Sequence, residues 1–289
     1  MPDYGHDLQL GTFIVPQSAR PERPVELALS TERAGLDLVT FMDHPHNAGF
    51  LDTWTLLSYV AARTERVHLS GYVLNLPSRP PAFLARAAAS LDLLSGGRFE
   101  LGIGPGDYYV GEANAAMGAP LRSRRESLEA LSEAIEIIRG TWDTSLPGPV
   151  VHEGEHYRIT GAMRGPRPAH EIGVWIPAAG PRGPRLAGRK ADGWIAGGLW
   201  MHDVDAELAE ANRVIDDAAA TAGRDPGAVR RIFDFGPAHF SVERLLPLAL
   251  EHGVSTFILV GDDPAAIERW GSEVGPALRD AVASARSQS

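Results

Sequence analysis

Short apolar runs of strand type alternate with longer amphipathic segments of helix type along the whole chain. Strict alternation of this kind favours parallel strands joined by right-handed crossovers. The predicted strands are residues 8–14, 37–42, 67–74, 98–103, 172–177, 193–196, 230–235 and 255–260. Eight strand–helix units predict an α/β fold of the closed (β/α)8 type, the TIM barrel, rather than an open sheet.

Local signals indicate where several helices begin. Asp52 is a good N-cap residue, and Asp263 is followed by Pro264 at the first helical position. Ser123 and Glu126 have the spacing of a capping box, ahead of a strongly amphipathic segment. These signals support the helical half of the predicted alternation.

The chain has 289 residues, which fits one barrel domain of about 250 residues with additions. No linker or change in composition divides it, so we expect residues 1–289 to form one domain. Residues 140–170 are rich in Pro and Gly, with only a short strand-like patch near Tyr157. We expect this segment to be an excursion over the barrel surface.

Composition and charge exclude several classes of function. The formal net charge is −10, which opposes binding to the phosphate backbone of nucleic acid. The absence of cysteine removes disulfides, thiolate metal sites and cysteine nucleophiles. The N-terminus does not resemble a signal peptide, and no apolar run reaches the roughly 18 residues that a membrane span requires. We therefore expect a cytoplasmic protein that acts on a small-molecule substrate, with no nucleic acid or membrane partner.

The stretch FMDHPH, residues 41–46, follows the second predicted strand, where barrels of this kind carry active-site residues. Pro45 favours an extended conformation at His44, so Asp43 and His44 should point in opposite directions near the barrel mouth. His44 is therefore a candidate catalytic residue. The alternative is structural: Asp43 caps backbone amides and His44 is a hydrogen-bonded residue of the rim.

The stretch GIGPGD, residues 102–107, follows the fourth predicted strand. Its glycines do not have the spacing of a dinucleotide-binding motif. We expect Gly104 and Gly106 instead to let a ligand approach the backbone closely. Asp107 would then lie beside that ligand as a candidate acid, although a simple turn residue is an equally good interpretation.

The stretch AAGPRGPR, residues 178–185, lies between the fifth strand and a helix. Backbone amides at a helix N-terminus bind anions, and Arg182 and Arg185 add positive charge. This pattern predicts a site for a cofactor phosphate, with an ordinary strand-to-helix turn as the alternative.

Four longer stretches carry a resemblance to a known family: ERAGLDLVTFMDH, DTWTLLSYVAARTERVHLSGYVLNLPSRPPAFLARAAASLDLLSGGRFELGIGPG, EALSEAIEIIRGTW and GPRLAGRKADGW. Together they run from about residue 32 to residue 194 and resemble the luciferase-like oxidoreductases. That family is a (β/α)8 barrel that uses reduced FMN or the deazaflavin F420. Its members include monooxygenases and F420-linked hydride-transfer enzymes.

The resemblance implies roles for individual residues. His44 matches a histidine beside ring and substrate, and Asp107 stands where the F420-linked sugar-phosphate dehydrogenases have an acid. Tyr72 and Val73 match a bulge, often with a cis peptide bond, that supports one face of the ring, and residues 180–183 match the phosphate loop. The residues expected to contact the cofactor are Asp43, Tyr72, Val73, Asn75, Gly104, Gly106, Gly180, Arg182 and Gly183.

The chain also departs from the family pattern. After ADGW, the sugar-phosphate dehydrogenases carry Thr and Lys where this chain has Gly197 and Trp200. Bacterial luciferases place an arginine for the FMN phosphate after the fourth strand, where this chain has Pro105. The sequence therefore leaves both FMN and F420 open as the cofactor.

The sequence predicts a flavin-type oxidoreductase. It would either exchange a hydride with a substrate through F420 or oxygenate a substrate through FMN. One alternative is a metal-dependent barrel hydrolase built on His44 and His46. The fifth and sixth strands end without histidine or carboxylate, so we expect no metal site. The other alternative is a barrel that binds flavin without turnover. The sequence is also compatible with a homodimer.

Overall fold

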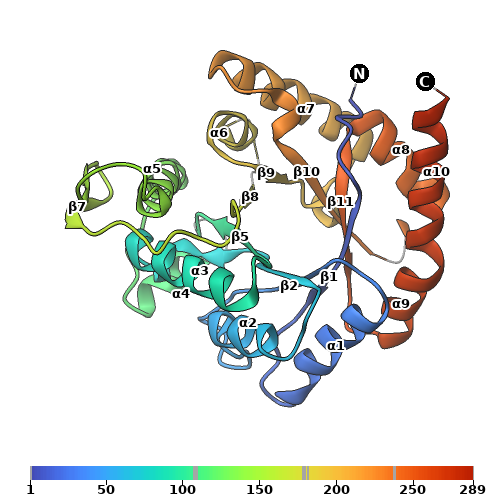
Figure 1. Ribbon diagram of the computed structural model, residues 1–289, viewed down its shortest axis with the longest axis horizontal. Helices are drawn as coiled ribbons and strands as arrows, with labels where there is room; N and C mark the ends of the chain where they lie inside the picture. The colour runs from blue at the N-terminus through green and yellow to red at the C-terminus, as the bar shows by residue number, and fades with distance from the viewer. Residues whose placement is uncertain (1, 107–109, 178–179, 181, 237–238, 289) are drawn as a thin grey trace.

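The computed structural model describes residues 2–106, 110–177, 180, 182–236 and 239–288. Within these residues, eight parallel strands form a closed barrel with helices around its outside (Figure 1). The strands, in order around the barrel, are β1 (Gln9–Ile14), β2 (Leu38–Phe41), β3 (His68–Gly71), β5 (Phe99–Gly104), β8 (Val174–Pro177), β9 (Gly193–Ile195), β10 (Arg230–Phe235) and β11 (Val254–Val260). The β1–β11 pairing closes the ring. The predicted TIM barrel is confirmed.

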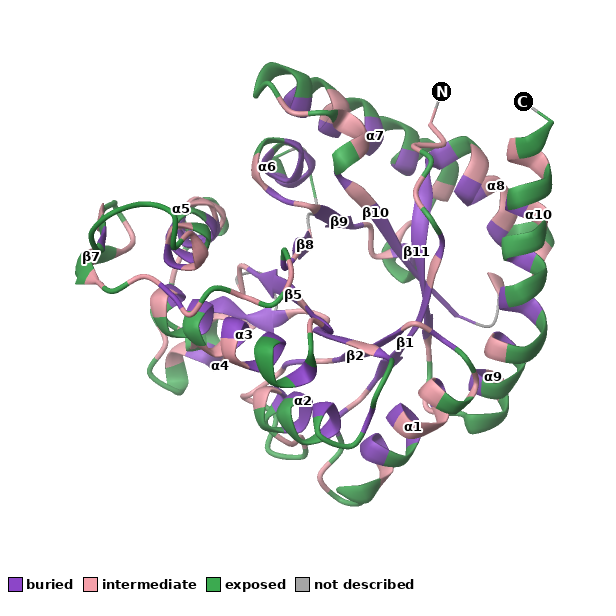
Figure 2. Cartoon of the chain, viewed as in Figure 1, coloured by how far each residue is buried: buried purple, intermediate pink, exposed green. Residues whose placement is uncertain are grey.

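The helices bury one face against the strands and expose the other, as Figure 2 shows by colour. They are α1 (Glu22–Arg33), α2 (Thr53–Ala61), α3 (Pro81–Ser95), α5 (Arg124–Trp142), α6 (Arg182–Lys190), α7 (Val204–Thr221), α8 (Val242–His252), α9 (Pro264–Arg269) and α10 (Gly275–Ser287). The predicted caps are present: Asp52 accepts from the Thr55 amide, and Ser123 forms a capping box with Glu126. None of the described helices is long and apolar enough to cross a membrane.

Side chains fill the inside of the barrel. Because successive side chains of a strand point to opposite faces, Phe13 and Ile258 point inward whereas Ile14 and Leu259 pack under the helices. The inner cluster of buried apolar residues is Phe13, Leu38, Trp175, Ile195, Ile232 and Ile258. The barrel is therefore a packed core, and a ligand has room only above it, at the ends of the strands.

The predicted strand 67–74 is broken after Gly71, at the bulge that the family resemblance implies, and resumes as β4 (Leu74–Asn75), followed by the short 3-10 helix η1 (Leu76–Ser78). Other elements were not expected from the sequence. A short helix, α4 (Gly111–Ala116), follows β5, and the turn η2 (Gly198–Trp200) follows β9. The excursion contains an antiparallel hairpin of β6 (Val150–Glu153) and β7 (Arg158–Ala162) rather than a single patch.

Candidate active site at the carboxyl end of the barrel

An apolar floor closes the barrel at the carboxyl ends of the strands. Its side chains pack on the inner cluster and remain partly exposed, and they are Val15, Met42, Tyr72, Val73 and Val260. They come from the ends of β1, β2, β3 and β11, so they lie on the face that carries the active site in TIM-barrel enzymes. A flat, largely apolar ring system fits a surface of this kind.

Tyr72 and Val73 form the break in the third strand. The peptide bond between them is cis, as the family resemblance implies. The Tyr72 ring lies edge-on to Phe13, with ring centroids 5.5 Å apart. The Tyr72 hydroxyl is buried without a hydrogen-bond partner in the described part of the chain. Burial, with a smaller effect of the Asp234 carboxyl, raises the pKa of Tyr72 well above its ordinary value.

Gly104 and Gly106 are required by packing within the protein. A Cβ atom on Gly104 would lie 2.5 Å from Cγ2 of Val73. Gly106 has a φ of +68°, and a Cβ there would lie 2.8 Å from the ring of Pro77. The Cβ positions of these glycines face the strand-three bulge and the turn after it, and the close approach of a ligand to their backbone stays a prediction. Gly104 therefore acts through Val73, which it allows to sit on the floor.

Asp43 is buried and bound to the protein itself. Its Oδ2 accepts from the backbone amide of Asn75 at 2.7 Å and from Nη1 of Arg79 at 2.6 Å, and its Oδ1 accepts from Nη2 of Arg79 at 3.2 Å. The carboxylate thus ties the end of β2 to β4 and to the η1 turn. This matches the structural alternative for Asp43, and the sequence analysis did not identify its partner Arg79.

Asn75 also has partners within the chain. Its side-chain amide exchanges hydrogen bonds with that of Asn114, at 3.0 and 3.2 Å, and Asn114 also donates to the Gly106 carbonyl at 3.3 Å. Asn114 lies on α4, which the sequence did not predict. The network fixes α4 and Gly106 against β4. Asp107 itself lies outside the described residues.

His44 lies two residues beyond Met42 of the floor and is partly exposed. Its ring centroid is 5.1 Å from that of His46, and the rings are tilted by 57°. Burial lowers the pKa of His44, the nearby His46 lowers it further, and Asp43 opposes the shift. The imidazole of His44 is therefore neutral near pH 7 and able to accept a proton.

Two carboxyl groups at the mouth were missed by the sequence analysis. Asp234 points into the barrel from β10, is buried, and accepts a hydrogen bond from the Gly198 amide. Asp262 follows β11 and accepts from the Val15 amide at 3.4 Å. Burial raises the pKa of both groups. The acidic side of the mouth is therefore at β10 and β11.

The predicted anion site lies on another part of the mouth, at the end of β8. Gly180 has a φ of +72°, and a Cβ there would lie 3.3 Å from Nη2 of Arg124, the first residue of α5. The exposed Arg182 and the buried Gly183 begin α6. The structure thus brings Gly180, Arg182 and Gly183 together at a helix N-terminus, and it adds Arg124 to the predicted set. Residues 178, 179 and 181 are outside the described ranges.

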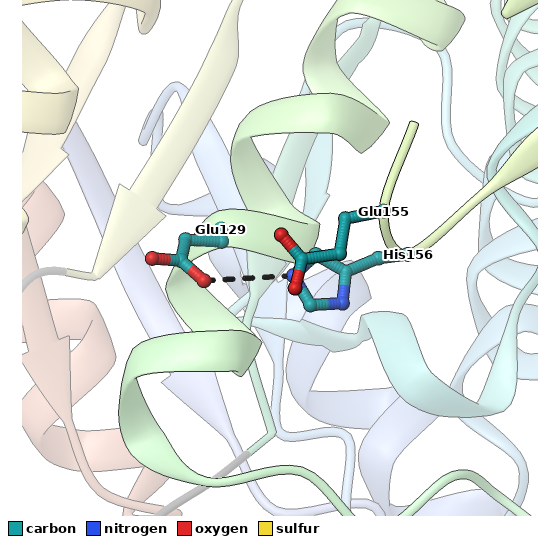
Figure 3. Close-up of side chains that lie close together, drawn as sticks. All are labelled: Glu129, Glu155 and His156. Atoms are coloured by element: carbon teal, nitrogen blue, oxygen red, sulfur yellow. Dashed lines mark ion pairs between the residues drawn. The ribbon is translucent and has the colours of Figure 1, made fainter. Parts of the chain in front are cut away.

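A metal-dependent hydrolase would need a third ligand beside His44 and His46. Among the described residues, the group of three side chains able to hold a metal is Glu129, Glu155 and His156, with Glu129 Oε2 3.7 Å from His156 Nε2 (Figure 3). These residues lie on α5 and in the β6–β7 turn, outside the barrel (Figure 1). The described residues therefore provide no three-ligand cluster at the mouth.

The sequence matches a family model over residues 8–270, and that model describes the luciferase-like monooxygenases. The chain belongs to this family. The family resemblance inferred from the sequence is thus confirmed, and the protein is an oxidoreductase of the luciferase-like type.

Curated relatives of the same family cover most of the chain. The F420-dependent glucose-6-phosphate dehydrogenase of Intrasporangium calvum is 31% identical over 291 residues, which covers 92% of this chain and 82% of the relative. The enzymes of the same name from Kineococcus radiotolerans and Nocardia farcinica are 31% and 32% identical, over 80% and 79% of this chain and 68% of each relative.

Solved structures of luciferase-like proteins share the fold. An F420-dependent secondary alcohol dehydrogenase in complex with an F420-acetone adduct superposes with a TM-score of 0.76 at 20% identity, covering 96% of this chain and 99% of the other. Riboflavin lyase with modified FMN and riboflavin superposes with a TM-score of 0.80 at 16% identity, over 95% and 92%. Identities this low support the barrel fold and carry no conclusion about the cofactor.

Proposed function

We propose that the protein is an F420-dependent oxidoreductase that transfers a hydride between the deazaflavin and a small organic substrate. The observation that carries this proposal is the partly buried His44, which follows β2 two residues after Met42 of the floor; burial lowers its pKa and leaves it a neutral base. The curated relatives, which are named as F420-dependent enzymes, favour this cofactor over FMN.

The residues present fit a ring with a phosphate-bearing tail. The partly exposed side chains of the floor would contact one face of the ring. Val73 can lie in the floor because Gly104 has no side chain to displace it. Arg182, Arg124 and the amide groups at the start of α6 would hold the phosphate. Both parts lie at the carboxyl ends of the strands, as one continuous ligand would require.

When bound, F420 supplies or accepts a hydride on one face of its ring. The chain's own part in the reaction is to support the opposite face on the floor and to move a proton. His44 would take the proton of a substrate hydroxyl during oxidation and return it during reduction. The Asp43–Arg79 pair would hold the β2 end in place, so Asp43 is a positioning residue.

Oxygenation through reduced FMN is the second candidate, because the family includes monooxygenases. Solved luciferase-like structures with this fold include a long-chain alkane monooxygenase, at a TM-score of 0.77 and 14% identity. A barrel that binds flavin without turnover is the third. His44 separates the third candidate from the first two, because a carrier has no need for a neutral base beside the ring.

Anaerobic binding titrations with FMN, reduced FMN, F420 and reduced F420 test the proposal. We expect saturable, stoichiometric binding of F420 and weaker binding of both FMN forms. Tighter binding of FMN than of F420 would contradict the proposal and favour the monooxygenase.

We also propose a homodimer, with which the sequence is compatible. Sedimentation of the same sample tests this oligomeric state.

A further inference from the structure

We propose that the side of the mouth formed by the ends of β9, β10 and β11 is the substrate side, and that it takes an uncharged, largely apolar alcohol or ketone. This inference rests on the proposed function. It assigns a substrate class that differs from the sugar phosphate named for the curated relatives. The basis is the distribution of charge and apolar surface around the mouth.

The segments that follow these three strands contain no lysine or arginine. They are residues 196–203, with the sequence AGGLWMHD, residues 236 and 239–241, with G and HFS, and residues 261–263, with GDD; residues 237 and 238 lie outside the described part of the chain. Their charged residues are all acids, and the buried carboxyl of Asp234 adds to them from inside the barrel. A phosphate dianion placed here would face like charge and would find no lysine or arginine within these segments.

Among the described residues, Arg23 and Arg269 contact this side from neighbouring elements, and both make other interactions. Arg23 donates to the Asp262 carbonyl at 2.9 Å, with Glu26 at 4.0 Å from its other terminal nitrogen. Arg269 lies over the ring of Phe240 and pairs with Glu273 at 3.5 Å. These guanidinium groups stabilise the loops and their own helices.

Apolar surface takes the place of positive charge. Leu199 and Trp200, in the η2 turn after β9, are 48% and 80% exposed. Val15 and Val260 of the floor lie on the same side and are partly exposed. Exposed apolar groups gathered at a ligand site gain free energy when an apolar ligand covers them.

The opposite side of the mouth has the complementary character. Arg124 and Arg182 lie around the Gly180 turn at the end of β8, where the helix dipole of α6 also favours an anion. The cofactor phosphate therefore takes the cationic side, and the acidic and apolar side is left for the substrate.

In the oxidation of a secondary alcohol, the carbinol C–H bond breaks and its hydride reduces oxidised F420. The hydroxyl proton passes to His44, and the product is a ketone.

The test uses the full chain loaded with reduced F420, which cannot accept a hydride from an alcohol, so that the change in cofactor absorbance reports ligand binding alone. The probes are 2-propanol, 2-butanol, 2-pentanol and 2-hexanol, compared with glucose, glucose 6-phosphate and inorganic phosphate. We expect affinity to rise about three- to fourfold for each added methylene in the alcohol series. We expect no binding of inorganic phosphate and no gain for glucose 6-phosphate over glucose.

Two variants of one residue sharpen the test. Trp200→Lys places a cation on the apolar side, so it should weaken 2-hexanol binding and introduce competition by inorganic phosphate. Trp200→Phe keeps an aromatic side chain at this position, so it should retain the chain-length dependence of the alcohol series and gain no competition by inorganic phosphate. Circular dichroism of both variants confirms that they are folded.

The possible failures are distinct. If F420 does not bind, the proposed function fails. If F420 binds and glucose 6-phosphate binds at least tenfold more tightly than glucose, the inference is overturned while the proposed function stands. An alcohol series without any dependence on chain length, or without any binding, also overturns it.

Discussion

The imidazole rings of His44 and His46 lie 5.1 Å apart at the end of β2, and the presence of His46 lowers the pKa of His44. In the proposed mechanism the two residues have different functions. His44 would accept the proton, and His46 would lower the basicity of His44 because two neighbouring imidazolium charges repel each other.

The pH dependence of activity should report this coupling. Alcohol oxidation requires neutral His44, so activity should fall as pH drops through the pKa of His44, which lies below the ordinary imidazole value of 6.5. His46→Ala removes the repulsion and part of the burial, so the pKa of His44 should rise. The acid limb of the profile of kcat/KM should then move to higher pH. A limb that stays in place, or that moves to lower pH, would show that His46 does not lower the pKa of His44.

Removal of His44 should affect turnover far more than cofactor binding. A positioned general base contributes about 10²- to 10⁴-fold to the rate, so His44→Ala should lower kcat by that order. The dissociation constant for F420 should stay near the parent value. His46→Ala is the matched control and should lose much less activity at its own optimum pH. Parent-like turnover in His44→Ala would make His44 a packed rim residue only.

Charge reversal at the start of α6 should weaken cofactor binding. Arg182→Glu places a negative charge at the helix N-terminus that would hold the phosphate, so the dissociation constant for F420 should rise by about tenfold or more. Arg189→Glu is the control, because it makes the same change of charge in the last turn of the same helix. Equal effects of both variants would point to a general electrostatic effect, and no effect of either would place the phosphate elsewhere.

Gly104 should not tolerate a side chain. In Gly104→Ala the new methyl group would lie 2.5 Å from Cγ2 of Val73, so Val73 must move. We expect a loss of about 1–3 kcal/mol in the free energy of unfolding, together with weaker F420 binding. Gly140→Ala on α5 is the control, since its nearest described neighbour is 3.8 Å away and alanine favours the helix. Denaturant unfolding and cofactor titration measure both effects, and normal values in Gly104→Ala would contradict the assigned role.

The barrel could be predicted because the sequence signals for each strand and each helix lie within that element. The alternation of apolar runs with capped amphipathic segments, such as the one that Ser123 and Glu126 begin, repeats in every unit of the chain. The hairpin in the excursion was missed because Gly161 and the polar residues around it interrupt the strand pattern. The break at Tyr72 and Val73 was placed by family resemblance, since nothing in the composition of that apolar run marks it.

The candidate site was predicted only where its residues follow a strand directly. Position on the barrel identified His44, Gly180 and Arg182. The partners that fix the site are distant in sequence: Asp43 and Arg79 are 36 residues apart, and Asn75 and Asn114 are 39 apart. Asp234 was missed for a different reason, because a single acid within an apolar strand gives no sign of whether it faces the barrel interior or the helices.

Anaerobic reduction of F420 by an alcohol tests the proposed hydride transfer most directly. Oxidised F420, the full chain and 2-hexanol are mixed in the strict absence of oxygen, and the visible absorbance of the oxidised deazaflavin is followed together with the ketone formed. Hydride transfer predicts loss of that absorbance with one ketone per cofactor reduced, and no loss when the chain is omitted. No reduction without oxygen, combined with oxygen-dependent conversion of the alcohol by the chain and reduced FMN, would contradict it.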